Sequence, residues 1–468
     1  MKILFFVKRN ILLITVLLLA FFLRFDRVGS FMPFIGDQGW FYLSARDMLV
    51  NQQVPLVGIT SSHTWLHQGP LWTYILAAAL FLGKFNPISG AVLSGFLGLF
   101  AVFLTYKIGE DFFSRRMGVI AAFLMATSPL VIIHDRMPYH TAPIAFIVSL
   151  LIYSILAWTR RKQNFFPVVC LSISLLYNFE LATVVFVPVV LFFLFYGLYK
   201  KEKWVKALKN KKIMIASFFC LLIPMIPILI YDTQNGFPQT VKYAGWFIYK
   251  AGQLVGLYKG STGESLSTVI GFFFSRYQIF SFMPSLSISA LVFASSIYVV
   301  ARDGIKKITS VIGIILLSTL VPFLGFILSK TSSEAYIPML FPGLVLSIAY
   351  LFNLFFQSKY KSLAFLALII ICVTNSYSIF EVNYLAGTRG GFGPSLEGRI
   401  LASKKIIKLS DNKSFSINFK GPGSEFASST MNYEYLIWWL SGKRPTKNGV
   451  VKIEISEPDY KIIVKRTF

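Results

Sequence analysis

The chain of 468 residues is 55% hydrophobic and only 14% charged, with a mean hydropathy of +0.66. Apolar runs long enough to cross a bilayer recur along it, which excludes an ordinary soluble domain and predicts a polytopic α-helical membrane protein. Lys and Arg number 45 against 20 for Asp and Glu. These basic residues gather in every second short loop between apolar runs, as cytoplasmic loops do, so we expect membrane lipids and no nucleic acid among the partners.

The first predicted element is a membrane span from about residue 11 to 28. Basic residues precede it as in a signal peptide, but no small-residue cleavage site comes after it, so we expect an uncleaved anchor with a cytoplasmic N-terminus. Arg24 and Arg27 are expected to extend their charged ends to the outer interface. The long first outer loop, 29–86, contains two short patterned segments that suit helices lying in the interface.

The next apolar runs predict a total of about eleven spans, each roughly 20 residues long. After the first span they cover approximately 87–108, 118–133, 141–158, a pair around the turn at 177–180, 213–231, 283–300, 308–328, 336–356 and 363–380. The sequence thus predicts a membrane domain over 1–380. An odd number of spans places the C-terminal remainder of the chain outside the cytoplasmic membrane.

From residue 381 hydropathy falls, which predicts a second, small α/β domain over 381–468. A Gly-rich and Pro-containing segment at 390–394 indicates a flexible joint. Beyond it, 396–409 has the pattern of an amphipathic helix, and three segments alternate like strands: 415–419, 450–455 and 460–464.

The first candidate site lies just outside the first span, where Asp37 stands in a Gly-flanked turn. Its carboxylate could cap the helix that begins near Trp40. It could also act as a general base that takes a proton from an attacking hydroxyl. In that case Gln38, Trp40 and Tyr42 would help shape a pocket of carbohydrate size.

A second polar group closes the same loop, with Trp65, His67 and Gln68 before a Gly-Pro helix start. His67 could simply anchor the helix at the interface. Two histidines near an aspartate could bind a divalent cation, but their spacing is not that of a metal site, so we predict no metal and no other cofactor.

Further polar residues stand at the ends of later spans. Asp135 and Arg136 could form a local ion pair, or Arg136 could bind a phosphate through its planar guanidinium, with His140 close by. Carboxylates that enter apolar surroundings need a reason. The other candidate substrate-binding residues at such positions are Tyr139, Asn178, Glu180, Glu334 and Tyr336, although a plain interfacial anchor also explains Glu334.

These segments together resemble the GT-C membrane glycosyltransferases, specifically the family 39-like group of protein O-mannosyltransferases and lipid A aminoarabinose transferases. The resemblance covers about 11–380. It rests on four motifs: Asp37 to Tyr42, Gly69 to Tyr74, Asp135 to Tyr139 and Tyr336 to Pro342.

Two residues depart from the family pattern. Gln38 replaces a second acid, and Gln68 stands where many members carry a lysine. The first departure argues against a paired-carboxylate site. The second departure removes one cation that usually faces the donor phosphate. Arg136, Arg24 or Lys242 would have to supply that positive charge instead.

The resemblance implies a GT-C fold and transfer of a hexosyl or pentosyl group from a polyprenyl-phosphate donor. The acceptor would be a hydroxyl of a lipid, glycan or protein on the outer face of the membrane. Asp37 would be the base of an inverting reaction, and Arg136 with His67 or His140 would stabilise the leaving phosphate.

Two other functions fit part of the pattern. A lipid-linked glycan ligase would use a large late outer loop, for which 232–267 is the candidate segment. A transporter or flippase of lipid-linked sugars would require broken helices and polar residues near the bilayer midplane, often in repeated halves. The ionisable residues stand instead at span ends, and no repeat is evident.

Overall fold

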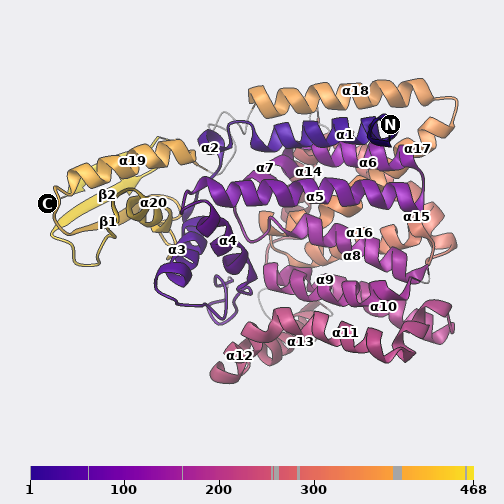
Figure 1. The fold of residues 1–468 in the computed structure, drawn as a ribbon, viewed down its shortest axis with the longest axis horizontal. Coiled ribbons are helices and arrows are strands. Elements are labelled where there is room, and N and C mark those ends of the chain that lie inside the picture. Colours follow the sequence, from indigo (N-terminus) through magenta and orange to yellow (C-terminus); the bar gives the residue numbers. More distant parts are fainter. Residues whose placement is uncertain are drawn as a thin grey trace.

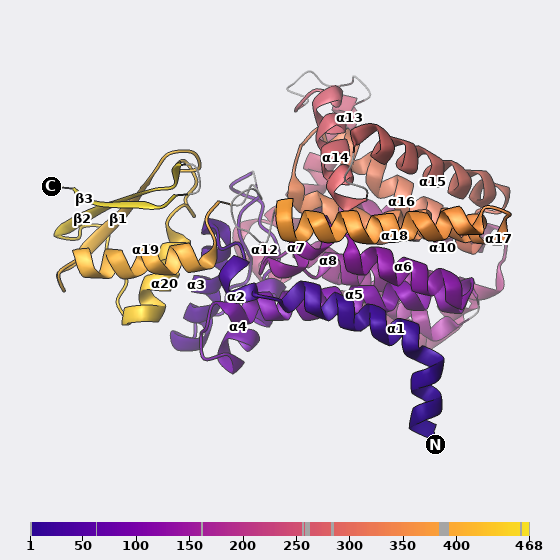
Figure 2. The same cartoon turned by 90° about the horizontal axis from the view of Figure 1, so that it is seen from above.

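The computed structural model describes residues 2–61, 63–160, 162–254, 257, 263–281, 285–382, 393–458 and 461–467. Most of the predicted joint at 390–394, the start of the span predicted at 283–300 and the first residue of the strand predicted at 460–464 lie outside these ranges. The chain forms a bundle of long helices with a small α/β domain at one end (Figure 1). The N-terminus lies at the other end of the bundle (Figure 2).

The α-helices of the membrane domain are, in chain order, α1 (Lys2–Phe25), α2 (Val28–Phe31), α3 (Gly36–Val50), α4 (Leu71–Leu82), α5 (Ile88–Phe112), α6 (Arg115–Thr127), α7 (Pro129–Arg136), α8 (Ile144–Thr159), α9 (Phe166–Phe179), α10 (Phe186–Tyr199), α11 (Lys211–Leu222), α12 (Ile226–Asn235), α13 (Tyr243–Leu254), α14 (Leu266–Phe280), α15 (Leu286–Lys306), α16 (Val311–Ser329), α17 (Phe341–Gln357) and α18 (Lys361–Tyr377). Short 3₁₀ or π turns connect several of them: η1 (Gln163–Phe165), η2 (Leu181–Val185), η3 (Lys203–Lys209), η4 (Ile223–Met225), η5 (Pro238–Lys242), η6 (Glu334–Leu340) and η7 (Ser378–Val382).

Seven helices among the described residues are long and apolar enough to cross a membrane, or eight if the bent pair α6–α7 counts as one span. Segment 10–25 of α1, helix α4 and helix α8 are apolar but shorter. Each predicted span overlaps at least one helix of the membrane domain, and the one before 177–180 overlaps α9, which is not among these candidate spans. The predicted class, a polytopic α-helical membrane protein with short helices in its first long loop, is confirmed.

The 63° bend between α6 and α7 has a local cause. Pro129 begins α7, and the residue before a proline is disfavoured in the helical conformation. Ser128 is accordingly extended, with φ −63° and ψ 120°. Its hydroxyl donates to the carbonyl oxygen of Phe280 at 2.7 Å. The bend directs α7 toward the end of the bundle that carries the polar loops.

The C-terminal domain contains α19 (Leu396–Leu409), β1 (Phe415–Lys420), α20 (Met431–Ser441), β2 (Val451–Ser456) and β3 (Ile463–Thr467). The sheet order is β1-β2-β3, with β1 parallel to β2 and β2 antiparallel to β3. Ile406 of α19 and Ile453 of β2 belong to its small core. The helix at 396–409 and the first two strands agree with the sequence prediction, the third strand lies at 463–467 and overlaps the predicted 460–464 only in part, and α20 was not predicted.

Helix α20 has apolar side chains on two faces, which ties the two domains together. Tyr433 and Ile437 pack in the small core of the C-terminal domain. Tyr435 and Leu436 belong instead to the large core of the membrane domain. Helix α20 packs against α3 of the first outer loop, so the domain rests directly on the first candidate site (Figure 1).

Candidate active site

Asp37 lies in the first turn of α3, where a carboxylate is stabilised by the positive end of the helix dipole. Its side chain is partly buried and accepts two hydrogen bonds. The Tyr139 hydroxyl donates to Oδ2 at 3.1 Å, and the Ser428 hydroxyl donates to Oδ1 at 2.6 Å. Burial, reinforced by the Asp37 charge, raises the pKa of Tyr139 well above its usual value, so the phenol stays protonated and donates.

A second acid, Glu180, lies close to this pair at the end of α9. His140, the neighbour of Tyr139, brings Nε2 to 3.2 Å from Glu180 Oε2, and Gln68 Nε2 donates to the same oxygen at 3.2 Å. The Ala182 backbone N–H donates to Oε1 at 3.1 Å. The Glu180 side chain is 4% exposed, so it is a buried and well-partnered carboxylate.

The first outer loop and the span ends therefore meet at one place. The ring of Phe41 in α3 contacts the rings of both Tyr139 and His140, with centroids 5.9 and 5.5 Å away. Gln68 also accepts from the Leu181 N–H at 3.1 Å. The dipeptide Tyr139-His140 thus connects Asp37 on one side with Glu180 on the other.

His67 lies beside this cluster and is partly buried. Its Nδ1 is 3.3 Å from the Gly58 carbonyl oxygen, and its Nε2 is 3.5 Å from the Tyr231 hydroxyl. Burial lowers the pKa of His67 below its usual 6.5, against the opposing effect of the Gly58 carbonyl. The imidazole is therefore a neutral hydrogen-bonding group near pH 7. Nearby, the Lys242 ammonium lies 4.4 Å from the centre of the Trp65 ring.

Arg24 does not reach the outer interface, so that expectation was wrong. Its side chain is fully buried, and it pairs with Asp135 through Nε at 2.8 Å and Nη2 at 2.7 Å. Its remaining N–H groups donate to the carbonyl oxygens of Ala20, Met125 and Ala126. Asp135 therefore pairs with a residue of α1 and not with Arg136, because the bend at Pro129 turns α7 toward α1.

Arg136 is buried at the end of α1. Its Nη1 donates to the Leu23 carbonyl oxygen at 3.1 Å and its Nη2 to that of Asp26 at 2.7 Å. A cation that binds the last carbonyls of a helix satisfies unpaired acceptors and complements the helix dipole. This arrangement gives Arg136 a structural reason to be present. Its role in phosphate binding stays a prediction.

A third charged group lies where η6 begins. Glu334 Oε2 is 3.4 Å from Nη2 of Arg276 in α14, and its Oε1 is 3.6 Å from Nε2 of buried His134. Arg276 is 27% exposed, and its buried Nε has no hydrogen-bond partner among the described residues. Tyr336 lies within η6, which packs against η2, the turn after Glu180.

Four other predicted residues shape the first loop and its support. Gln38 is fully buried and accepts from the Ile35 N–H at 2.8 Å, so it caps α3. The Trp40 ring packs edge-on against Phe41 at 5.2 Å. Tyr42 donates to the Pro87 carbonyl oxygen at 2.6 Å. Asn178 donates to the Ser174 and Pro224 carbonyl oxygens, both at 3.1 Å.

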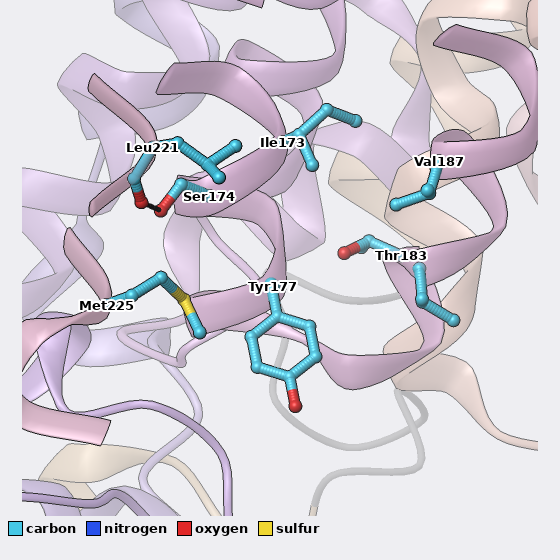
Figure 3. Close-up of a pocket in the computed structure, with 8 residues that line it drawn as sticks. Ile173, Ser174, Tyr177, Thr183, Val187, Leu221 and Met225 are labelled. Carbon is cyan, nitrogen blue, oxygen red and sulfur yellow. Dashed lines mark hydrogen bonds between the residues drawn. The ribbon is translucent and has the colours of Figure 1, made fainter. Parts of the chain in front are cut away.

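An apolar groove of about 170 Å³ opens beside this end of the bundle (Figure 3). It lies between α9, α10 and α11 and their connecting turns, and its walls are Ile173, Ser174, Tyr177, Thr183, Val184, Val187, Leu221 and Met225. The Ser174 hydroxyl is turned to the Leu221 carbonyl oxygen, as the dashed line in Figure 3 shows. The groove is therefore lined almost entirely by apolar groups, and Tyr177 precedes Asn178 and Glu180 by one turn or less.

Sequence reasoning missed two residues of this region. Ser428 stands in a polar stretch of the C-terminal domain 391 positions away from Asp37, and nothing in the sequence signals their contact. Arg276 lies in α14, between the spans predicted at 213–231 and 283–300, although an arginine in an apolar run is itself a signal. Within the described part of the chain, no group of three or more His, Cys, Asp or Glu side chains could hold a metal ion.

Comparisons with known proteins agree on the architecture. A family model described as dolichyl-phosphate-mannose-protein mannosyltransferase matches residues 67–231. The crystal structure of ArnT from Cupriavidus metallidurans bound to undecaprenyl phosphate matches with a TM-score of 0.62, covering 98% of this chain and 98% of that chain at 11% identity. The protein has a GT-C fold.

A second GT-C protein is similar over most of this chain. The archaeal oligosaccharyltransferase AglB from Archaeoglobus fulgidus, in complex with an inhibitory peptide and a dolichol-phosphate, matches with a TM-score of 0.58 at 13% identity. The match covers 93% of this chain and 63% of AglB. No curated protein matches the sequence significantly. The resemblance predicted from the sequence motifs is thus confirmed at the level of the fold.

Proposed function

We propose that this GT-C protein transfers a sugar from a polyprenyl-phosphate donor to an acceptor hydroxyl, with Asp37 as the base. The position of Asp37 carries the proposal. Its carboxylate is partly exposed at the polar end of the bundle, and each oxygen accepts one hydrogen bond, from Tyr139 or from Ser428. A carboxylate has about four lone-pair sites, so room remains for an acceptor hydroxyl.

Asp37 is a better base than Glu180, the other acid of the cluster. Glu180 is enclosed by His140, Gln68 and the Ala182 N–H, and its side chain is only 4% exposed. An acceptor could reach it only by displacing these partners. We assign Glu180 to positioning His140 and the His67–Gln68 segment.

The reaction is consistent with these positions. The acceptor hydroxyl gives its proton to Asp37 while its oxygen attacks the anomeric carbon of the donor. The bond from that carbon to the phosphate oxygen breaks on the opposite face, so the configuration inverts and polyprenyl phosphate leaves. No metal ion or other cofactor is needed for this balance of atoms and charges.

Negative charge grows on the phosphate as the bond breaks, and cationic groups should stabilise it. Arg24 is saturated by Asp135 and backbone carbonyls, and Arg136 is engaged by the end of α1. Arg276 forms an ion pair with Glu334 at 3.4 Å, but its side chain is partly exposed and its buried Nε is unpartnered within the described part of the chain; Lys242 is exposed. We therefore favour Arg276 and Lys242, with neutral His67 as a hydrogen-bonding partner.

We infer that the apolar groove binds part of the lipid tail of the donor. The wall of the groove includes Tyr177 and Thr183, three residues before and after Glu180 in the sequence, so an isoprenoid chain in it would bring its phosphate near the polar cluster. Undecaprenyl phosphate and dolichol-phosphate are the lipids named in the similar ArnT and AglB structures. The basic loops lie at the opposite end of the bundle and favour a cytoplasmic location there, so we infer that the site faces the outside of the cytoplasmic membrane.

The experiment that tests this proposal measures release of undecaprenyl phosphate by mass spectrometry. Full-length protein in nanodiscs is given synthetic undecaprenyl-phosphate hexoses and pentoses, with a membrane extract as the acceptor source. Wild type should consume at least one such donor and no nucleotide sugar. Asp37→Asn should slow release by about 100-fold or more, the usual contribution of a general base.

The matched control is Asp47→Asn, which removes a carboxylate from the same helix, where Asp47 pairs with Arg46 and Arg444. Its rate should stay within about threefold of wild type because the ion pairs of Asp47 do not involve Asp37, Tyr139 or Ser428. Full turnover by Asp37→Asn would contradict the base assignment. Movement of intact donor across liposomes without release of undecaprenyl phosphate would instead indicate a flippase.

A further inference from the structure

The C-terminal domain is joined to the first outer loop by buried polar contacts. The Asn432 side-chain amide in α20 donates to the Phe34 carbonyl oxygen at 2.8 Å. The Tyr435 hydroxyl donates to the Phe85 carbonyl oxygen at 2.7 Å. Both carbonyls belong to the segments that flank α3 and α4. The domain therefore fixes the position of the loop that carries Asp37.

The surface of α3 is shaped to receive this domain at close range. A Cβ atom added at Gly36 would lie 2.2 Å from the Ser428 carbonyl oxygen, and one added at Gly39 would lie 2.0 Å from the Asn432 nitrogen. Both neighbours are backbone atoms, which cannot rotate aside. Only glycine at these two positions of α3 lets the chain at 428–432 come this close.

This close approach brings a side chain of the C-terminal domain into the candidate active site. The Ser428 hydroxyl donates to Asp37 Oδ1 at 2.6 Å, while Tyr139 from the membrane domain donates to Oδ2 at 3.1 Å. Each carboxylate oxygen is thus held by a different domain. Rotation of the carboxylate about its terminal bond would break both hydrogen bonds together.

We propose that the C-terminal domain completes the active site and that Ser428 is a positioning residue for Asp37. This inference rests on the proposed function, because it assumes that Asp37 is the base. A base must be held within a narrow range of orientations to accept a proton as the sugar bond breaks. The Ser428 hydrogen bond supplies one of two fixed points, and the domain supplies Ser428 only while α20 is docked on α3.

A purely structural contact makes a different prediction. The two hydrogen bonds from Asn432 and Tyr435, together with the aromatic contacts of Tyr435, hold the interface without Ser428. Loss of the Ser428 hydroxyl should therefore leave the domain docked. If the contact matters only for folding, catalysis in the docked protein will not change.

The first test compares Ser428→Ala and Ser428→Thr with Ser424→Ala in the donor-release assay. Ser424 is exposed in the same loop and serves as the control. Ser428→Ala should lower kcat about tenfold, in line with loss of a hydrogen bond to a charged group. The KM for the donor should stay within about twofold, since Ser428 touches the base and not the lipid. Ser428→Thr keeps the hydroxyl and should recover most of kcat.

The second test displaces the whole domain without removing a polar group. Gly39→Ala should raise hydrogen exchange over 428–441 and lower kcat, because the added methyl meets the Asn432 backbone. Gly245→Ala in α13 is the matched control, since nothing lies within 4 Å of its Cβ position among the described residues. Alanine forms helices better than glycine, so the effect cannot come from helix propensity.

The outcomes separate this inference from the proposed function. If Asp37→Asn is inactive while Ser428→Ala keeps full kcat, the positioning role is refuted and the function stands. If Ser428→Ala loses kcat but its exchange over 428–441 also rises, the hydroxyl acts in docking and the positioning role is again refuted. If Asp37→Asn is fully active, the proposed function itself fails.

Discussion

The buried pair of Arg24 and Asp135 gives the sharpest prediction about stability. Asp135→Asn keeps the shape of the side chain and removes its charge, leaving the Arg24 cation inside the bundle. The pair makes one charge-assisted hydrogen bond, from Arg24 Nε to Asp135 Oδ2 at 2.8 Å, and an ion contact from Nη2 to the same oxygen at 2.7 Å; its side chains are 0% and 3% exposed. Loss of that bond alone costs about 1.5–3 kcal/mol. The buried charge left unpaired on Arg24 brings the expected loss to the roughly 3–5 kcal/mol of breaking a buried ion pair.

The assay is thermal unfolding in detergent, followed by fluorescence-detected gel filtration. Asp135→Asn should lower the melting temperature strongly. Asp303→Asn, which removes a carboxylate from the exposed pair with Arg302, should lower it little. The double variant Arg24→Met with Asp135→Asn should recover part of the loss, because it leaves no unpaired charge. Equal shifts for Asp135→Asn and Asp303→Asn would refute the reasoning, and unchanged stability with lost transfer would assign Asp135 to catalysis.

Two further predictions concern pH and metal ions. Burial lowers the pKa of His67 in the folded chain below the value of about 6.5 that it has in the unfolded chain. The unfolded chain therefore binds more protons below about pH 6.5. The contribution of His67 to stability is present above that pH and is lost as the pH falls. Melting temperatures between pH 7.5 and 5.5 should therefore fall less for His67→Gln than for wild type, whereas parallel curves would argue against a buried neutral imidazole. EDTA should leave donor release within about twofold of the untreated rate, consistent with the atom balance of a base-catalysed transfer. A loss that one divalent cation restores would show that a metal takes part.

The helices and the first candidate residues were predictable because they depend on local patterns. Apolar runs locate the spans, and Gly, Pro and aromatic residues mark the first loop. The pairing of charges was not predictable, since it depends on where distant helices meet. Asp135 and Arg136 are adjacent in the sequence, yet one pairs with Arg24 and the other binds the end of α1. The bend before Pro129 decides this, and its direction comes from packing.

In the C-terminal domain, too, local patterns predict most of the elements but not the contacts between distant segments. Its helix α19 and its strands are predictable from alternation and amphipathic spacing. Helix α20 has no single apolar face, because its side chains pack in two cores at once. A sequence pattern therefore gives no helix signal there. The contact between Ser428 and Asp37 depends on the docking of α20 on α3, so it could not be predicted from the sequence either.

The most direct test of the central claim is to separate donor binding from transfer in Asp37→Asn. Full-length wild type and Asp37→Asn are loaded with the same synthetic undecaprenyl-phosphate sugar, and lipid binding and single-turnover release are measured on each sample. If Asp37 acts as the base and does not bind the donor, Asp37→Asn should bind the donor lipid as well as wild type does and release undecaprenyl phosphate at least about 100-fold more slowly. Equal release would contradict the account, and so would loss of donor binding together with release.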